Sequence, residues 1–269
     1  MIASGASLLE LAGLTAAVPP WLSPYRDEIR RLIACAANTE ALSQTLNRTL
    51  AEHAPVSLQA GPLTFVPQLD LPVGEAYETF IARTACVPTR DNLHDLFNGL
   101  VWLKFPQLKR RLNELQAQQL QQDGVMSTRG PVRDALTLFD ENAAVLQAPS
   151  VISDALRARD WHALFVTHRA AWADTSLTLF GHALMEKLTQ PRKAMTAHVW
   201  VVPQQVNLQT HLIDMLTPAL LASKPYLPMQ VLGVPGWSAA NEEPGYYDDV
   251  QVFRPLTKTP PNAQEIIPR

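Results

Sequence analysis

Apolar residues recur at helical spacing through most of the chain. Leu93, Leu96, Phe97, Leu100 and Val101 fall at positions i, i+3, i+4, i+7 and i+8, which is the spacing of one buried helix face. This stripe predicts an amphipathic helix with one face in the core. Similar spacing predicts further helices over residues 25–36, 42–50, 75–84, 106–115, 150–172, 175–188 and 204–222.

A smaller number of segments read as strands. Residues 195–202 are rich in Val and Trp and predict a central strand. Residues 135–139 and 143–146 flank the polar triplet at 140–142, which predicts a β-hairpin with a short turn. A last short strand is expected at 250–254.

This irregular order of helices and strands indicates the α+β class. We expect one predominantly helical domain with a β-hairpin and a small sheet, spanning residues 1–269. Its core is expected at about 20–255, preceded by an apolar N-terminal arm (1–20) and followed by a frayed tail (256–269) that contains Pro260-Pro261.

Composition and charge argue against several classes of function. Apolar residues make up 47% and charged residues only 17%, which is typical of a globular chain. The formal charge of −3 argues against nonspecific electrostatic binding of nucleic acid. No run of 18 apolar residues predicts a membrane span. Two cysteines and no basic N-terminal leader favour a cytoplasmic protein.

The first candidate cluster lies on the polar side of the 93–101 helix. His94, Asp95 and Asn98 are short, stiff side chains, suited to fixed hydrogen bonds, acid–base work or metal ligation. The structural alternative is that Asp91 stabilises the helix N-terminus and His94 caps a neighbouring loop.

Two further clusters follow along the chain. Arg133 and Asp134 precede the expected hairpin, where Arg133 can clamp an anion or the pair can anchor a sheet edge. His182 and Glu186 are four residues apart on one expected helix and can ligate one divalent ion. They match no established metal motif, and the pattern by itself favours a hydrogen-bonded pair. Gly181 is expected to permit a close approach of another element.

A fourth cluster decorates the proline-rich segment from residue 232 to 255. Trp237, Asn241, Tyr247 and Asp248 can form a binding wall on a rigid loop, or a lid packed down for stability. Two other polar groups are given structural roles: Asp140 and Glu141 as turn residues, and Lys104 with residues 109–111 as a solvated helix face. The Rossmann, P-loop and G-x-S-x-G motifs are absent from the sequence.

Four ordered blocks also carry a resemblance. They are C-V-P-T-R-D-N-L-H-D-L-F-N-G-L-V-W-L-K-F-P from Cys86, G-P-V-R-D-A-L-T-L-F-D-E-N from Gly130, F-G-H-A-L-M-E-K-L from Phe180, and G-V-P-G-W with the Y-Y-D-D and V-F-R-P motifs from Gly233. Together they resemble an uncharacterised bacterial family, domain of unknown function 3025, over residues 20–255. The resemblance implies a single-domain bacterial, cytoplasmic protein, and it implies no activity. It places these residues in the shared blocks: His94, Asp95, Asn98, Arg133, Asp134, His182, Trp237 and Asp248.

Our leading hypothesis is an enzyme that hydrolyses a small anionic or phosphorylated substrate in one composite pocket. His94 or His182 would be the general base, since imidazole titrates near neutral pH, and Asp95 or Asp134 would orient it. The expected substrate-binding residues are Asn98, Arg133, Trp237, Asn241, Tyr247 and Asp248.

Two variants of this hypothesis stay open. In the first, a divalent metal assists the reaction, held by His94, Asp95, His182 and Glu186. In the second, the protein is a non-catalytic binding or scaffold protein whose polar blocks lock helices together. The sequence does not determine the substrate or the oligomeric state.

Overall fold

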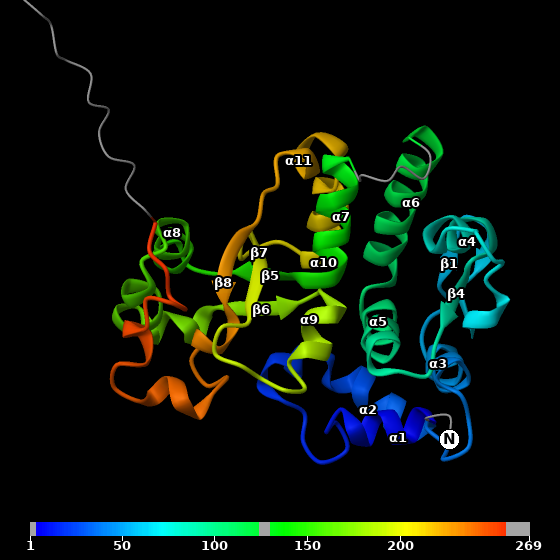
Figure 1. Cartoon of the computed structure of the whole chain (residues 1–269), viewed down its shortest axis with the longest axis horizontal. Coiled ribbons are helices and arrows are strands. Elements are labelled where there is room, and N and C mark those ends of the chain that lie inside the picture. Colours follow the sequence, from blue (N-terminus) through cyan, green and yellow to red (C-terminus); the bar gives the residue numbers. More distant parts are fainter. Residues whose placement is uncertain (1–3, 124–129, 257–269) are drawn as a thin grey trace, which may run out of the picture.

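The computed structural model describes residues 4–123 and 130–256. It has a helical half and a half built around a four-stranded sheet (Figure 1). The α+β class with a predominance of helix is therefore confirmed. The helices of the first half are α1 (Gly5–Leu11), α2 (Arg26–Cys35), α3 (Leu42–Ala51), α4 (Tyr77–Thr84), α5 (Leu93–Lys104) and α6 (Pro106–Asp123).

The sheet half contains shorter helices on both sides of the sheet. In Figure 1, α7 stands on one side of the sheet and α8 on the other. These helices are α7 (Pro131–Asn142), α8 (Ser150–Ala158), α9 (His182–Lys187), α10 (Leu208–Met215) and α11 (Pro218–Ala222). Shorter turns of helix are η1 (Pro20–Tyr25), η2 (Gln68–Asp70), η3 (Ala163–Thr167, a π-helix), η4 (Arg169–Asp174), η5 (Val231–Gly233), η6 (Ala239–Glu242) and η7 (Tyr246–Asp248).

The main sheet has the strand order β6-β5-β7-β8. Strand β5 runs parallel to β7, and the outer strands β6 and β8 are antiparallel to their neighbours. Two small sheets accompany it: an antiparallel hairpin of β1 and β2, and a parallel pair of β3 and β4. The strands are β1 (Ser57–Leu58), β2 (Gly61–Pro62), β3 (Thr64–Pro67), β4 (Cys86–Thr89), β5 (Ala143–Gln147), β6 (Ser176–Leu179), β7 (Thr196–Val202) and β8 (Leu227–Gln230).

Several element predictions are confirmed. The apolar stripe of α5 is buried, including Leu96 and Leu100 at 1% exposure or less. Strand β7 lies between β5 and β8, so the central strand predicted at 195–202 is present.

The region predicted as an N-terminal arm contains α1, which packs against α3 and α5 and buries Leu8 and Leu9. Residues 257–269 of the predicted frayed tail lie outside the described residues.

The hairpin predicted at residues 135–146 is wrong. Residues 131–142 form helix α7, which begins with Pro131 at its first position and leads directly into β5. Proline is favoured at a helix start because its missing N–H has no intrahelical partner there. The apolar residues Ala135, Leu136 and Phe139 form the buried side of this helix.

Three other predictions also need correction. The helix expected over 150–172 ends at Ala158, where Arg159 adopts a left-handed conformation. The helix expected over 175–188 is strand β6 followed by α9. Residues 250–254 form turns and a bend, whereas the final strand of the sheet is β8. Short apolar runs fit strand and helix alike, so tertiary pairing decided these cases.

Candidate metal centre

His94 lies in the first turn of α5. Asn92 caps this helix, since its side chain accepts a hydrogen bond from the backbone N–H of Asp95 at 2.8 Å. Because the α5 stripe faces the core, His94 lies toward α9, with 30% of its side chain exposed. Its Nδ1 is 3.0 Å from Oε2 of Glu186. A carboxylate at this position favours the proton on Nδ1 and leaves the Nε2 lone pair free.

His182 is the first residue of α9 and is almost fully buried. Its position depends on Gly181, where a Cβ atom would lie only 2.4 Å from the backbone nitrogen of Asn142. The close approach predicted for Gly181 is therefore present, and it brings α9 against the end of α7. The Nε2 atom of His182 lies 3.0 Å from the Nε2 atom of His94.

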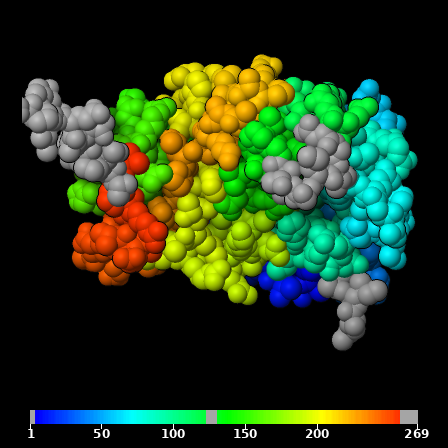
Figure 2. Space-filling model, turned by 45° about the horizontal axis from the view of Figure 1, so that its top comes forward, coloured from blue at the N-terminus to red at the C-terminus, as the bar shows by residue number. Residues whose placement is uncertain are grey.

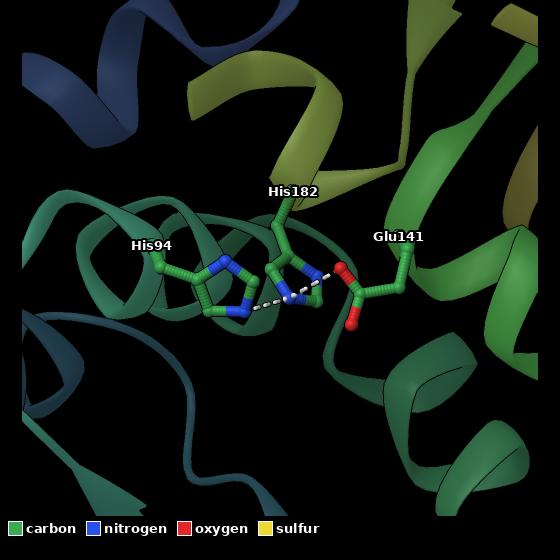
Figure 3. A group of neighbouring side chains, drawn as sticks. All are labelled: His94, Glu141 and His182. Atoms are coloured by element: carbon green, nitrogen blue, oxygen red, sulfur yellow. Dashed lines mark hydrogen bonds and ion pairs between the residues drawn. The ribbon is translucent and has the colours of Figure 1, made fainter. Parts of the chain in front are cut away.

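Glu141 completes the group from the last turn of α7. Its Oε2 lies 3.6 Å from Nε2 of His182. Figure 3 shows the side chains of His94, His182 and Glu141 projecting from three separate helices toward a common point. One potential ligand atom from each residue lies within 4.8 Å of the other two. These three residues are called the metal centre below.

A second carboxylate, that of Asp140, lies near Nδ1 of His182, on the opposite side of the ring from His94. Oδ2 of Asp140 lies 3.8 Å from Nδ1 of His182, which makes no hydrogen bond within the described residues. Burial lowers the pKa of His182 to about 4, so its ring is neutral, as a metal ligand must be. Both imidazoles thus have a carboxylate near Nδ1 and direct Nε2 toward the same space. This arrangement is typical of histidines that ligate metals.

The carboxylates next to this space have different pKa values. Burial and the neighbouring Asp140 raise the pKa of Glu141. Burial alone would raise the pKa of Asp140 as well, but the charge and the hydrogen bond of the Lys109 ammonium outweigh it, so the pKa of Asp140 is lowered. Asp140 therefore remains an anion beside the two histidines.

A groove lies between α4, α6 and α7 and reaches the metal centre at Glu141. It encloses about 330 Å³ and includes Asp140, Glu141, Tyr77, Glu78 and Arg133 among its lining residues. Arg133 lies two helical turns before Glu141 on α7. Its guanidinium atom NH1 is buried and has no hydrogen-bond partner within the described residues. A guanidinium in this state is well suited to bind an anionic group.

The three residues lie within the part of the chain that matches a protein-family model. The family model described as "Protein of unknown function (DUF3025)" matches residues 63–257. The chain belongs to this family. The match contains all three residues of the metal centre, the two carboxylates behind them and Arg133. The searches of curated proteins and of solved structures found no match.

The other predicted residues of the first two clusters do not belong to this group of three. Both carboxylate oxygens of Asp95 accept hydrogen bonds from Arg90. Asn98 contacts Lys109 and Tyr77 in the interior. Asp134 is exposed on α7 and is not among the residues that line the groove.

The fourth cluster lies elsewhere. Its red and orange segment occupies one end of the molecule in Figures 1 and 2, while α4, in cyan, occupies the other. Asn241, Tyr247 and Asp248 line a separate cavity of about 400 Å³, which shares no lining residue with the groove. Trp237 packs against Trp21, with ring centroids 6.2 Å apart. The structure therefore does not bring these four residues to the metal centre.

Sequence reasoning missed three residues of this region. Glu141 and Asp140 were interpreted as turn residues, yet they occupy the last turn of α7. Lys109 was assigned to a solvated helix face, yet it is 5% exposed and contacts Asp140 at 2.6 Å. The Gly-Pro pair at 130–131 was the available signal, since it marks the start of a helix that carries both carboxylates to its end.

Among the residues that the structure describes, no helix combines the length and the apolar character needed to cross a membrane.

Proposed function

We propose that this protein is a metal-dependent hydrolase in which His94, His182 and Glu141 bind one zinc ion. The observation that carries the proposal is the pair of Nε2 atoms 3.0 Å apart, with a carboxylate oxygen 3.6 Å from one of them. Ligand atoms about 2.0–2.2 Å from a tetrahedral zinc are separated by roughly 3.4 Å. The observed separations match that geometry closely enough for small side-chain rotations to complete it.

Two imidazoles and one carboxylate are the ligand set of a catalytic zinc site with a fourth position open to water. Zinc lowers the pKa of a bound water to about 7 and so supplies a hydroxide nucleophile at neutral pH. Glu141 has 39% of its side chain exposed, which leaves a path for substrate and water. In this proposal the two histidines are ligands, which replaces the general-base role expected from the sequence.

The groove between α6 and α7 supports a small anionic or phosphorylated substrate. Arg133 lines this groove and would bind the anionic group through its guanidinium. The groove continues to Glu141, so a substrate held by Arg133 would extend toward the zinc. One water would be consumed: its hydroxide would form a bond to the electrophilic carbon or phosphorus, the bond to the leaving group would break, and the leaving group would take up the proton that the water had released.

The test begins with elemental analysis of the purified protein. We expect about one zinc ion per chain, lost in H94A and H182A and restored to the wild-type chain after chelation and dialysis against zinc. H53A is the matched control, because His53 is a half-buried histidine that hydrogen bonds Thr49 outside the metal centre. Zinc content in H53A should equal that of the wild type.

Activity is then measured with p-nitrophenyl phosphate and p-nitrophenyl esters that carry a carboxylate. We expect zinc-dependent turnover that falls at least about 100-fold in E141Q. R133M should raise KM for the anionic substrates with a smaller change in kcat. A protein that binds no metal would contradict the proposal and favour a structural polar cluster, and bound iron in place of zinc would contradict the assignment of zinc.

A further inference from the structure

Beneath the metal centre lies a buried lysine. Lys109 on α6 is 5% exposed, and its Nζ is 2.6 Å from Oδ1 of Asp140 and 2.9 Å from Oδ1 of Asn98. It also lies 5.4 Å from the centre of the Trp102 ring. Taking an ammonium out of water costs several kcal/mol, and such a group is stable only when it is paired and hydrogen bonded. Lys109 satisfies both conditions through residues next to the metal centre.

Asp140 connects this lysine to the metal centre. Its Oδ1 accepts a hydrogen bond from Lys109, while its Oδ2 faces Nδ1 of His182 at 3.8 Å. Asp140 also directly precedes Glu141 in the last turn of α7. The orientation of the Asp140 carboxylate therefore affects two of the proposed ligands: His182, which it faces, and Glu141, which follows it in the chain.

We propose that Lys109 is a positioning residue of the metal centre, which acts through Asp140. The ammonium fixes one oxygen of Asp140, so the other oxygen faces Nδ1 of His182 at 3.8 Å. The negative charge at that distance favours the proton on Nδ1 and leaves Nε2 directed at the metal. This inference rests on the proposed function, because it concerns the same three ligands.

The surrounding hydrogen bonds fit a positioning role. Asn98 accepts from Lys109 through Oδ1 and donates through Nδ2 to the Tyr77 hydroxyl at 3.1 Å. Lys109 is therefore held from two sides, by Asn98 and by Asp140. Stability alone does not explain such a pair, since replacing a buried ion pair with well-packed apolar residues is often neutral or stabilising. The network gives Asp140 one defined orientation.

The experiment is a double-mutant cycle read out as zinc affinity, measured by competition with a chromophoric chelator. We expect K109M to bind zinc about 10- to 100-fold more weakly than the wild type, the usual effect of losing an outer-shell partner. In a D140N background, K109M should weaken binding by less than about threefold, because the path through Asp140 is already removed. The visible spectrum of the cobalt-substituted protein should change in K109M, since it reports ligand geometry.

K104M is the matched control. Lys104 pairs with the buried carboxylate of Glu28 at 3.3 Å, and no hydrogen bond or ion pair in the described part of the chain joins it to Asp140 or the three ligands. It should lose stability without a change in zinc affinity or in the cobalt spectrum. If K109M does not fold, K109Q replaces it in the cycle. Because its uncharged amide can still donate to Asp140, we expect a smaller loss of zinc affinity than in K109M, and this loss should again shrink in the D140N background.

The outcomes separate the two proposals. If the wild-type protein binds no zinc, the proposed function fails. If the wild type binds zinc and K109M binds it equally well, only the positioning role of Lys109 is overturned. The positioning role is also overturned if K109M weakens binding equally in the wild-type and D140N backgrounds, because Lys109 would then act on the fold and not through Asp140.

Discussion

At the residue scale, the polar side chains of this protein differ in whether their polar atoms are already satisfied. Asp95 and Asn241 are buried and have their hydrogen bonds fulfilled within the fold. His94 and His182 instead bring two ring nitrogens together, each ring with a carboxylate on its opposite nitrogen. A buried side chain whose polar atoms are all hydrogen bonded supports the fold, whereas two ring nitrogens that converge on one point, each ring with a carboxylate near its other nitrogen, are typical of metal ligands.

Asn241 provides a first prediction. Its Nδ2 donates to the backbone carbonyls of Leu232 and Val234 at 2.9 and 2.7 Å. N241A would leave a buried carbonyl without its donor, so we expect a loss of about 2 kcal/mol in the free energy of unfolding. Urea denaturation measures this loss. Zinc affinity should not change, and a loss of substrate binding at unchanged stability would restore Asn241 as a substrate-binding residue.

Glu78 provides a prediction about pH. Burial and the nearby Asp140 raise the pKa of Glu78 from 4.5 to about 6. The folded state therefore holds this proton more tightly than the unfolded state, and the protein loses stability as pH rises from about 4.5 to about 6. The shift corresponds to about 2 kcal/mol in a fully buried site, and partial exposure of Glu78 reduces the expected effect to about half.

The substitution E78Q removes this titration and keeps an acceptor for Asn113, which donates to Glu78 at 2.6 Å. We expect metal-free E78Q to be about 1 kcal/mol more stable than the wild type at pH 7 and equally stable near pH 4. Urea denaturation at several pH values measures the difference. A constant difference across this pH range would contradict the assignment.

At the element scale, the metal centre depends on how closely α9 meets α7. The amide of Gly181 donates to the Ala143 carbonyl at 2.8 Å, which fixes the start of α9 against the junction of α7 and β5. This contact places His182 beside the carboxylates of α7. A longer side chain at position 181 would separate the two elements.

We therefore expect G181A to destabilise the protein by about 2–3 kcal/mol and to weaken zinc binding, because the added methyl group would meet backbone atoms that cannot move freely. Thermal unfolding and zinc titration measure the two effects. G236A is the control: Gly236 has φ +78° with open space around it, so alanine adds backbone strain alone. Zinc binding as strong in G181A as in G236A would show that the α7–α9 contact does not position His182.

At the scale of the whole molecule, the metal centre joins segments that are distant in sequence. His94 and His182 are separated by 88 positions, and Glu141 comes from a third helix between them. Helices α5 and α9 belong to the two halves of the molecule in Figure 1 and pack against each other at this point. A bound ion would thus link the helical half to the sheet half.

Zinc should stabilise the whole fold by mass action. At a free zinc concentration 100 times the Kd, we expect about 2.7 kcal/mol of added stability, and removal of zinc by a chelator should reverse it. Calorimetry with and without zinc measures the change in Tm. H182A should show no zinc-dependent shift, and a shift of the same size in H182A would mean that zinc binds elsewhere.

Much of the outline could be predicted from local patterns. The spacing of Leu96 and Leu100 fixed which side of α5 enters the core and therefore placed His94 outside it. The row of His182 and Glu186 indicated two residues of the same region, although Glu186 contacts Nδ1 of His94 and not the space between the Nε2 atoms. Residues 135–139 form part of a helix where a strand is predicted, because a run of five mostly apolar residues fits a strand and a helix alike.

The sequence by itself determined the α+β class, the family, and the candidate role of His94, His182 and Arg133, because helical periodicity and side-chain chemistry are local properties. Only the tertiary structure decided that Glu141 joins the histidines, that Lys109 lies buried behind them, and that the C-terminal aromatic segment lies apart. The physical reason is that periodicity shows which side of an element faces inward, whereas packing between elements decides which neighbour it meets.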